Sequence, residues 1–412
     1  MVTKPGRLAG SDLIGTRKMT PTTKQAAQQQ LESVRQGLLS LSHRIHSKPE
    51  LGFEEEHASA WLCETLDTAG FRVEKGVAGL PTAFVARSGH GPLQIGICAE
   101  YDCLPAIGHA CGHNLIAAMS AGAGIAAAKV ADDLGVTIVV LGTPAEEVGN
   151  ASGKIVMLER GAFDGLHAAM MVHPAPFDAA TMKIIAASLF DVCYHGKEAH
   201  ASAFPELGIN AADAITIAQT SLGLLRQHIR QTDRIHGIVT KGGDAPNIVP
   251  AHTSARYMIR SDNMQELEEL REKVRRCFEA GALATGAKLE FKGGDKAYAQ
   301  MHHDLALAAM YQRNAEALGR KFADLGPMRD RVAASTDMGN VSQAMPAIHP
   351  VIGIDSLPAV NHQPEFTAAC ITPAADRAIF DGALATAWTI VDLASDPSTR
   401  ARLLASSPGD FK

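Results

Sequence analysis

The pattern of apolar and polar positions divides the chain into two kinds of segment. In the first part, short runs of apolar and β-branched residues over 93–99, 136–141 and 168–172 are typical of strands buried on both faces. Helical spacing of apolar or small residues surrounds these runs, over residues 24–45, 55–69, 114–129 and 152–160. This strand–helix–strand alternation predicts an α/β fold with a mostly parallel sheet and helices on both of its faces.

The pattern changes after about Met182. The expected elements are then strand, helix, strand, strand, helix and strand, over residues 184–194, 210–230, 235–241, 253–260, 264–283 and 288–292. This βαββαβ order is that of the ferredoxin-like sandwich. It predicts a second domain inserted into the first.

After the insert the chain returns to the first kind of pattern. Helices are expected over residues 305–319 and 376–394, with a strand over 350–354 between them. We therefore expect three parts: a main domain made of residues 24–182 and 296–412, an inserted domain over 183–295, and a flexible tail over 1–23.

Composition narrows the classes of protein. The chain has 412 residues, 46% hydrophobic and 20% charged, which is the balance of an ordinary globular protein. The formal net charge of −6 and the lack of a dense Lys/Arg run argue against a nucleic-acid partner. The apolar stretch over 115–130 is short for a membrane span, so we expect a buried helix there and no membrane partner.

Two further features bear on the compartment. The tail over 1–23 has mixed charge and no apolar core, which is unlike a secretory signal. The 7 cysteines are odd in number and spread along the chain, which argues against a disulfide framework. We expect a reducing compartment, the cytoplasm.

Chemically active side chains follow several of the predicted strands. The run Glu100-Tyr-Asp102 follows the first, with His109-Ala-Cys111-Gly-His113 close behind, and Glu146-Glu147 follows the second. His173 follows the third strand, and His362 comes after the strand over 350–354. Ligands of open α/β sheets bind at the carboxyl ends of strands, so these side chains are expected to converge.

The convergent residue types suit a metal. Thiolate, imidazole and carboxylate ligands are those of a borderline-soft ion such as zinc. Each residue also has a purely structural interpretation: Cys111 as a buried thiol, Glu146 and Glu147 as solvated loop charges, and His173 or His362 as a core histidine. All of these residues follow strands of one predicted sheet, which favours a shared metal site over separate structural roles.

The sequence resembles the di-metal amidohydrolases of the aminoacylase and carboxypeptidase-G type. Within them it is most similar to the branch of p-aminobenzoyl-glutamate hydrolase and the β-alanyl-dipeptide hydrolase. The most characteristic motifs are Gly-His-Ala-Cys-Gly-His-Asn over 108–114 and Gly-Thr-Pro-Ala-Glu-Glu over 142–147. Further matching motifs lie at 46–53, 99–105, 196–200, 246–250 and 335–341. The resemblance implies a di-metal catalytic domain with an inserted lid or dimerisation domain.

The resemblance also implies a role for each metal-site residue. Cys111 would bridge two divalent ions. His113 and His173 would complete one site, and Glu147 and His362 the other. We expect zinc, with manganese or cobalt as alternatives. Glu146 would be the general base that activates water for attack on an amide carbonyl.

Residues of the insert are implied in catalysis and substrate binding. His200 would stabilise the oxyanion, and related enzymes often supply this histidine from a partner subunit, which implies a homodimer. Asn247 and Arg260 would contact a small peptide-like or N-acyl amino acid substrate with a free carboxylate. Without the resemblance, His200 would be interpreted as a surface residue and Arg260 equally well as a salt-bridged strand residue.

The chain departs from the family pattern at two positions and in one short run. Asn114 stands where auxin-conjugate hydrolases carry Asp, which supports the dipeptide branch. Cys103 replaces an expected Ala beside the site, and the usual glycine run after Glu147 is altered over 148–154. The altered run puts the rim of the pocket, and hence the choice of substrate, in doubt.

Two competing functions remain open from the sequence alone. Cys111 could be a nucleophile with His113 or His109 as its base, but a thiol protease of this kind leaves Glu146, Glu147 and the other histidines without a role. The second alternative is a non-catalytic binding or assembly protein that kept the fold. The intact Glu146 argues against it.

Overall fold

Six strands form the sheet of the main domain in the computed structural model, which describes residues 22–322, 326 and 333–406. Their order across the sheet is β1 (Arg72–Lys75), β2 (Phe84–Ser88), β4 (Val136–Gly142), β3 (Leu93–Ala99), β5 (Ala168–Met170) and β13 (Ala347–Ile348). From β4 to β13 all neighbours run parallel, whereas β1 and β2 are antiparallel additions at one edge. The predicted mostly parallel sheet is confirmed.

A buried helix lies behind this sheet. Helix α4 (His113–Ala128) packs against β3 and β4 and against α1 (Thr23–Ser33), α2 (Arg35–Ser47) and α12 (Pro373–Ser395). Small residues allow the close approach: a Cβ on Gly122 would come within 2.9 Å of the Leu38 side chain. The apolar stretch over 115–130 is therefore a core helix, as expected.

The remaining elements of the main domain are shorter or peripheral. The helices are α3 (Glu56–Thr68), α5 (Ala131–Leu134), α6 (Gly153–Glu159), α9 (Leu305–Ala317), α10 (Met338–Ala344), α11 (Pro364–Ala369) and α13 (Pro397–Ala405). Two pairs of short parallel strands are β6 (His173–Ala175) with β14 (Val351–Gly353), and β7 (Lys183–Ile184) with β12 (Ala333–Ala334). Within the described residues, α12 alone has the length and composition of a membrane span, and 78% of its most apolar window is buried in the protein.

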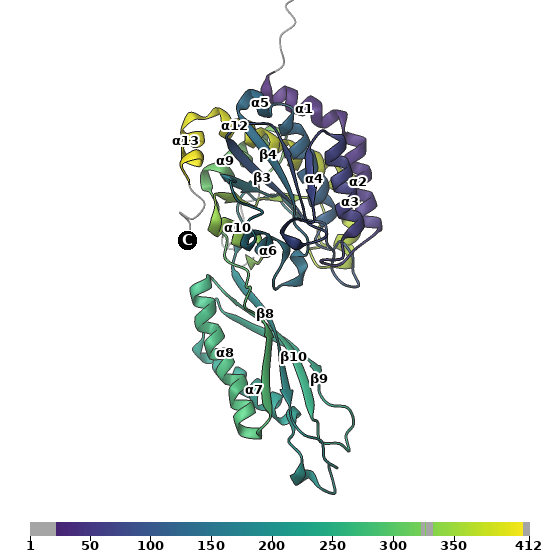
Figure 1. Ribbon diagram of the computed structural model, residues 1–412, viewed down its shortest axis with the longest axis vertical. Coiled ribbons are helices and arrows are strands. Elements are labelled where there is room, and N and C mark those ends of the chain that lie inside the picture. Colours follow the sequence, from purple (N-terminus) through teal and green to yellow (C-terminus); the bar gives the residue numbers. More distant parts are fainter. Residues whose placement is uncertain (1–21, 323–325, 327–332, 407–412) are drawn as a thin grey trace, which may run out of the picture.

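The insert extends from the main domain as an elongated lobe (Figure 1). It consists of β8 (Ala186–His195), α7 (Ala211–Leu225), β9 (Arg234–Lys241), β10 (His252–Ser261), α8 (Met264–Thr285) and β11 (Lys288–Gly293). The sheet order is β11-β8-β10-β9 with every pair antiparallel, and the two helices pack on it around a separate core that includes Phe278. The predicted βαββαβ order is confirmed.

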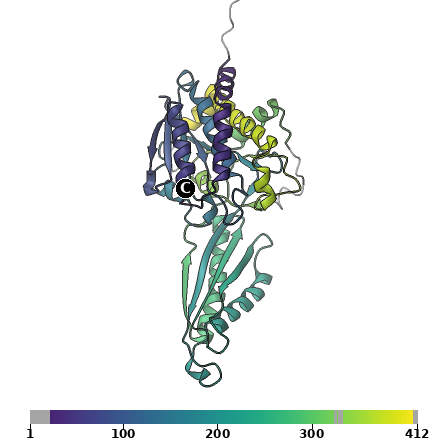
Figure 2. The same cartoon turned by 90° about the vertical axis from the view of Figure 1, so that its right-hand side faces the viewer.

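Strand directions place two connections at the far end of the insert. Strand β8 leaves the main domain at Ala186, β9 also runs outward, and β10 returns to the domain boundary. The connections over 196–210 and 242–251 therefore lie at the tip most distant from the main domain (Figures 1 and 2). We call these two connections the distal tip.

Some predicted boundaries differ from the structure. The single helix expected over 24–45 is two helices, because Val34 leaves the helical conformation with φ −106° and ψ 6°. The strand expected over 184–194 is broken at Ile185, whose N–H bonds the carbonyl of Ala334. The helix expected over 210–230 ends at Leu225. The predicted tail over 1–23 lies outside the described residues except for Thr22, which caps α1, and Thr23.

Candidate metal centre

The predicted ligands lie at one edge of the main sheet. Strands β4, β3 and β5 are adjacent and parallel, so the residues that follow them meet at their carboxyl ends. Glu147 follows β4, and His173 begins β6 just after β5. His113 opens α4 after the loop that follows β3. The open sheet thus brings together Cys111 and His173, which are 62 positions apart in the chain.

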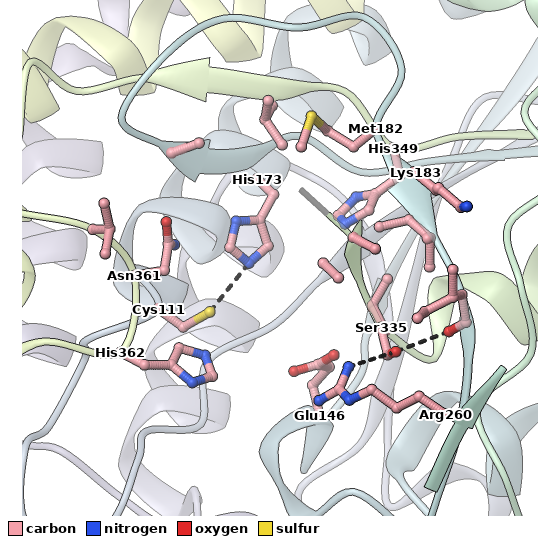
Figure 3. Close-up of a pocket in the computed structure, with 18 of the residues that line it drawn as sticks. Cys111, Glu146, His173, Met182, Lys183, Arg260, Ser335, His349, Asn361 and His362 are labelled. Atoms are coloured by element: carbon pink, nitrogen blue, oxygen red, sulfur yellow. Dashed lines mark hydrogen bonds between the residues drawn. The ribbon is translucent and has the colours of Figure 1, made fainter. Parts of the chain in front are cut away.

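Two groups of ligand atoms share one sulfur. Cys111 Sγ and nitrogens of His113 and His173 lie within 4.8 Å of one another. Cys111 Sγ also lies within 4.8 Å of atoms of Glu147 and His362 that meet the same limit. The Sγ atom is 3.4 Å from Nε2 of His173, with His362 on the other side of the sulfur in Figure 3. The five predicted ligands are therefore together, in the two groups expected for a bridging cysteine.

The donor set fits a pair of cations. Nε2 of His113 and Oε1 of Glu147 are buried and have no hydrogen-bond partner among the described residues. Buried polar atoms without partners cost free energy, which a coordinated cation would recover. Both histidines of the first group are held through Nδ1. Nδ1 of His113 lies 2.8 Å from the Asp102 carboxylate, and Nδ1 of His173 lies 2.8 Å from the Pro174 carbonyl. Their Nε2 atoms therefore face the other proposed ligands, which is the orientation that metal coordination needs.

Glu146 lies next to this donor set in a tight turn. Ala145, with φ 60°, leads into the 3-10 turn η2 (Glu146–Val148). Burial, with the nearby carboxylates of Glu100 and Glu147, raises the pKa of Glu146 well above its ordinary range. A carboxylate with a raised pKa holds an abstracted proton more readily, which suits a general base.

A cavity of about 1090 Å³ opens in front of these residues. The main domain contributes five of the lining residues: Cys111, Glu146, Glu147, His173 and His362. Figure 3 labels all of these except Glu147. The insert contributes Arg260 at the inner end of β10, where its Nη1 donates to Ser335 Oγ at 2.8 Å. The structure thus places Arg260 beside the predicted ligands.

His200 and Asn247 lie elsewhere. Both belong to the distal tip, where Ala201 N–H donates to the Asn247 carbonyl at 3.0 Å, and neither lines the cavity of its own chain. His200 is exposed, and its Nδ1 lies 3.2 Å from the N–H of Ala203. The expectation that these two residues reach the site is not met within one chain, because the strand directions carry them away from the main domain.

Comparisons with known proteins agree with this arrangement. Residues 185–285 match the family model described as the peptidase dimerisation domain. A mouse protein named Xaa-Arg dipeptidase is 39% identical over 392 residues, covering 91% of this chain and 90% of the mouse protein. One of the subunits of the Escherichia coli p-aminobenzoyl-glutamate hydrolase is 32% identical, covering 68% of this chain and 63% of that protein.

A solved structure shows the same fold. A Bacillus subtilis protein, described as a dinuclear metal binding peptidase of the M20 family, superimposes with a TM-score of 0.60 at 20% identity, covering 87% of this chain and 99% of that one. The chain belongs to the M20 metallopeptidase family. It is an enzyme that hydrolyses amide bonds in a metal-dependent reaction. The resemblance inferred from the motifs is confirmed, and the non-catalytic alternative is excluded.

This M20 metallopeptidase also contains a buried ionic cluster that was not predicted. The ammonium group of Lys154 lies 2.5 Å from Glu100 and 2.5 Å from Asp337, and all three side chains are fully buried. Burial alone lowers the pKa of Lys154, but the two carboxylates outweigh it and raise that pKa. Lys154 therefore stays charged and compensates the carboxylates behind Glu146.

The sequence contains a partial signal for this cluster. Glu100 directly follows its predicted strand, and Asp337 lies in the matching motif over 335–341. Lys154 ends the altered run over 148–154, which by itself indicates only a change at the rim of the pocket. Nothing in the spacing of these residues shows that they meet, so their contact could be found only in three dimensions.

Proposed function

We propose that the enzyme is a dipeptidase that releases the C-terminal residue of a dipeptide and holds two divalent cations through the five ligands. The observation that carries this proposal is the pair of ligand groups sharing Cys111, with Glu146 beside them at the cavity. The thiolate and imidazole donors favour zinc, with manganese or cobalt as alternatives.

The mechanism follows from the placement of Glu146. The cations would supply a water of lowered pKa and polarisation of the amide carbonyl. Glu146 accepts a proton from the attacking water as the oxygen of the water bonds to the carbonyl carbon. Glu146 then gives the proton to the amide nitrogen as the carbon–nitrogen bond breaks, so that a carboxylic acid and an amine leave.

The free carboxylate of the substrate is assigned to Arg260. The planar guanidinium fork suits bidentate carboxylate binding, and Arg260 reaches the cavity from the insert. Its partner is the neutral hydroxyl of Ser335, and among the described residues no carboxylate forms an ion pair with Arg260. An amidated dipeptide should therefore react much more slowly than the free acid.

The side chain of the released residue is proposed to be basic. The mouse and human relatives are named Xaa-Arg dipeptidase. Apart from Glu146 and Glu147, Asp262 is the one carboxylate among the described residues that line the cavity. Asp262 pairs with Lys183 at 2.9 Å and remains partly exposed, so a cationic substrate side chain can compete for it.

A substrate panel tests this assignment. Dipeptides ending in Arg, Lys, Leu and Glu are compared, and kcat/KM is expected to be highest for the basic residues. Asp262→Asn should lower kcat/KM for basic dipeptides and leave neutral ones unchanged, by about 10-fold if one charged hydrogen bond is lost. Asp191→Asn, which breaks an ion pair with Arg256 on the exposed face of the insert, is the matched control. Equal loss on neutral and basic dipeptides would remove Asp262 from the assignment.

A homodimer is proposed through the insert. The matched family model describes a dimerisation domain, and β9 is one of the two edge strands of the insert sheet. Ile238 and Val239 on this edge are 64% and 42% exposed. An unpaired edge with exposed apolar side chains suits pairing with a second copy. The partner would then bring His200 and Asn247 to the cavity.

Metal dependence is tested by removal and return. Chelation should abolish activity, and zinc, manganese or cobalt should restore it, with elemental analysis giving two ions per chain. Full activity in protein shown to be metal-free would contradict the proposed mechanism.

We also propose a reducing compartment, the cytoplasm, because all seven cysteines are free thiols in the structure.

A further inference from the structure

The backbone that carries Glu146 and Glu147 is held by side chains from distant segments. We call residues 145–149 the catalytic turn. Ala145 N–H donates to Oε1 of the buried Glu55 at 2.8 Å, and Glu147 N–H donates to Oδ2 of Asp102 at 2.9 Å. Ala145 adopts a left-handed backbone conformation, which is unfavourable for residues other than glycine because of their Cβ atom. The turn therefore depends on its surroundings for its shape.

A third side chain, Tyr298, forms hydrogen bonds to two backbone groups of this turn. Its hydroxyl donates to the carbonyl of Glu146 and accepts from the N–H of Gly149 at 3.1 Å. One hydroxyl has one proton to donate and lone pairs to accept with, so both bonds form together. Burial raises the pKa of Tyr298 well above 10, which keeps this proton in place. The hydroxyl of Tyr298 thus holds the main chain of Glu146, the proposed general base, in place.

The main chain of Tyr298 lies at the boundary between the two domains. Its N–H donates to the carbonyl of Ala187 at 2.8 Å, and its carbonyl accepts from the N–H of Ala187 at 3.0 Å. Ala187 is the second residue of β8, where the chain enters the insert, and Tyr298 lies where the chain returns from it. The next residue, Ala299, is bonded to Asn340 of α10 in the main domain at 3.0 Å. Tyr298 therefore connects the two chain crossings between the domains to the catalytic turn.

We propose that Tyr298 is a positioning residue that fixes the general base through the catalytic turn and links the placement of that base to the boundary between the two domains. This inference rests on the proposed role of Glu146. Tyr298 touches neither the ligands' metal-facing atoms nor the cavity, so it acts through Glu146 and not on the substrate.

The test is Tyr298→Phe in the metal-loaded enzyme. The phenyl ring keeps the packing against Ile155 and Ala187, while both hydrogen bonds to the catalytic turn are lost. A small misplacement of a catalytic group can cost up to about 10²-fold, so kcat should fall by roughly 10- to 10²-fold. KM and metal content should stay at their wild-type values, since no ligand or substrate contact is removed.

Tyr194→Phe is the matched control. Its buried hydroxyl donates to the carbonyl of Phe278 at 2.7 Å in the core of the insert, far from the catalytic turn. It should lower the melting temperature about as much as Tyr298→Phe does and leave kcat unchanged. If both variants lose stability and both keep the wild-type kcat, the inference is overturned. A loss of metal from Tyr298→Phe would also overturn it, because the effect would then act on the ligand Glu147.

A double variant separates this inference from the proposed mechanism. In a Glu146→Gln background, Tyr298→Phe should cause little further loss, because a positioning residue has no base left to position. A full additional loss there would overturn the inference and leave the base assignment standing. Wild-type turnover in Glu146→Gln alone would instead overturn the base assignment, and the inference with it.

Discussion

Asp102 Oδ1 lies 2.8 Å from Nδ1 of His113, and this contact determines which ring nitrogen faces the metal centre. With Nδ1 donating its proton to the carboxylate, Nε2 is the atom with a free lone pair. The second oxygen of Asp102 accepts from the N–H of Glu147 at 2.9 Å. One carboxylate therefore orients a ligand from each of the two proposed metal groups.

Asp102→Asn should weaken metal binding. The amide cannot offer two acceptor oxygens, so either His113 or the backbone of Glu147 loses its partner. Loss of such a supporting contact typically lowers metal affinity by about 10- to 100-fold. Competition with a chromophoric chelator measures the affinity, and circular dichroism checks that the fold is kept. Wild-type affinity would show that Asp102 does not orient the ligands.

Glu146→Gln and Glu147→Gln should have opposite effects. Glu146→Gln keeps the polar side chain but cannot accept a proton, so turnover should fall by about 10²- to 10⁴-fold while both metals stay bound. Glu147→Gln should lose metal first, because Oε1 of Glu147 is one of the buried atoms without a hydrogen-bond partner. Elemental analysis and kcat are measured on both proteins. Metal loss in Glu146→Gln would make that residue a ligand.

His200→Ala should lower kcat without loss of metal or of thermal stability, because His200 is exposed at the distal tip and contacts no proposed ligand. Removal of one oxyanion donor typically costs about 10²- to 10³-fold. Mixing His200→Ala with Glu146→Gln protein should restore part of the activity, since a hybrid dimer has one cavity with both groups intact. No recovery after confirmed subunit exchange would rule out a site shared between chains.

Glu55 should make stability depend on pH. Burial, together with the charge of Asp102, raises the pKa of Glu55 from 4.5 to about 7. The folded protein then binds this proton more tightly than the unfolded chain, so the contribution is complete below pH 4.5 and is lost as the pH rises to 7. Glu55→Gln cannot ionise and should gain stability relative to wild type across this range. Chemical denaturation of the metal-loaded proteins at several pH values measures the difference, and a constant difference would contradict the prediction.

The sequence predicted the parts of the molecule whose signals are local. The continuous β-branched run after residue 136 predicted β4 to within one residue, and the clusters after the strands predicted which ligands would meet. Strands β1 and β2 were not predicted. The short β1 has largely exposed side chains and so lacks an apolar pattern, whereas β2 has buried side chains only over its first three residues. The contacts of Tyr298 and Lys154 join segments more than 50 residues apart, and no periodicity in the chain encodes them.

The position of His200, away from the cavity of its own chain, affects how activity depends on enzyme concentration. Under the proposed shared site, a lone chain carries every metal ligand and still lacks a complete active site. Dilution would therefore lower the activity per chain, with half of it lost near the dissociation constant of the dimer. Newly made chains would be inactive until they bound a second copy. Well below the dissociation constant, the rate of hydrolysis would therefore rise with the square of the chain concentration.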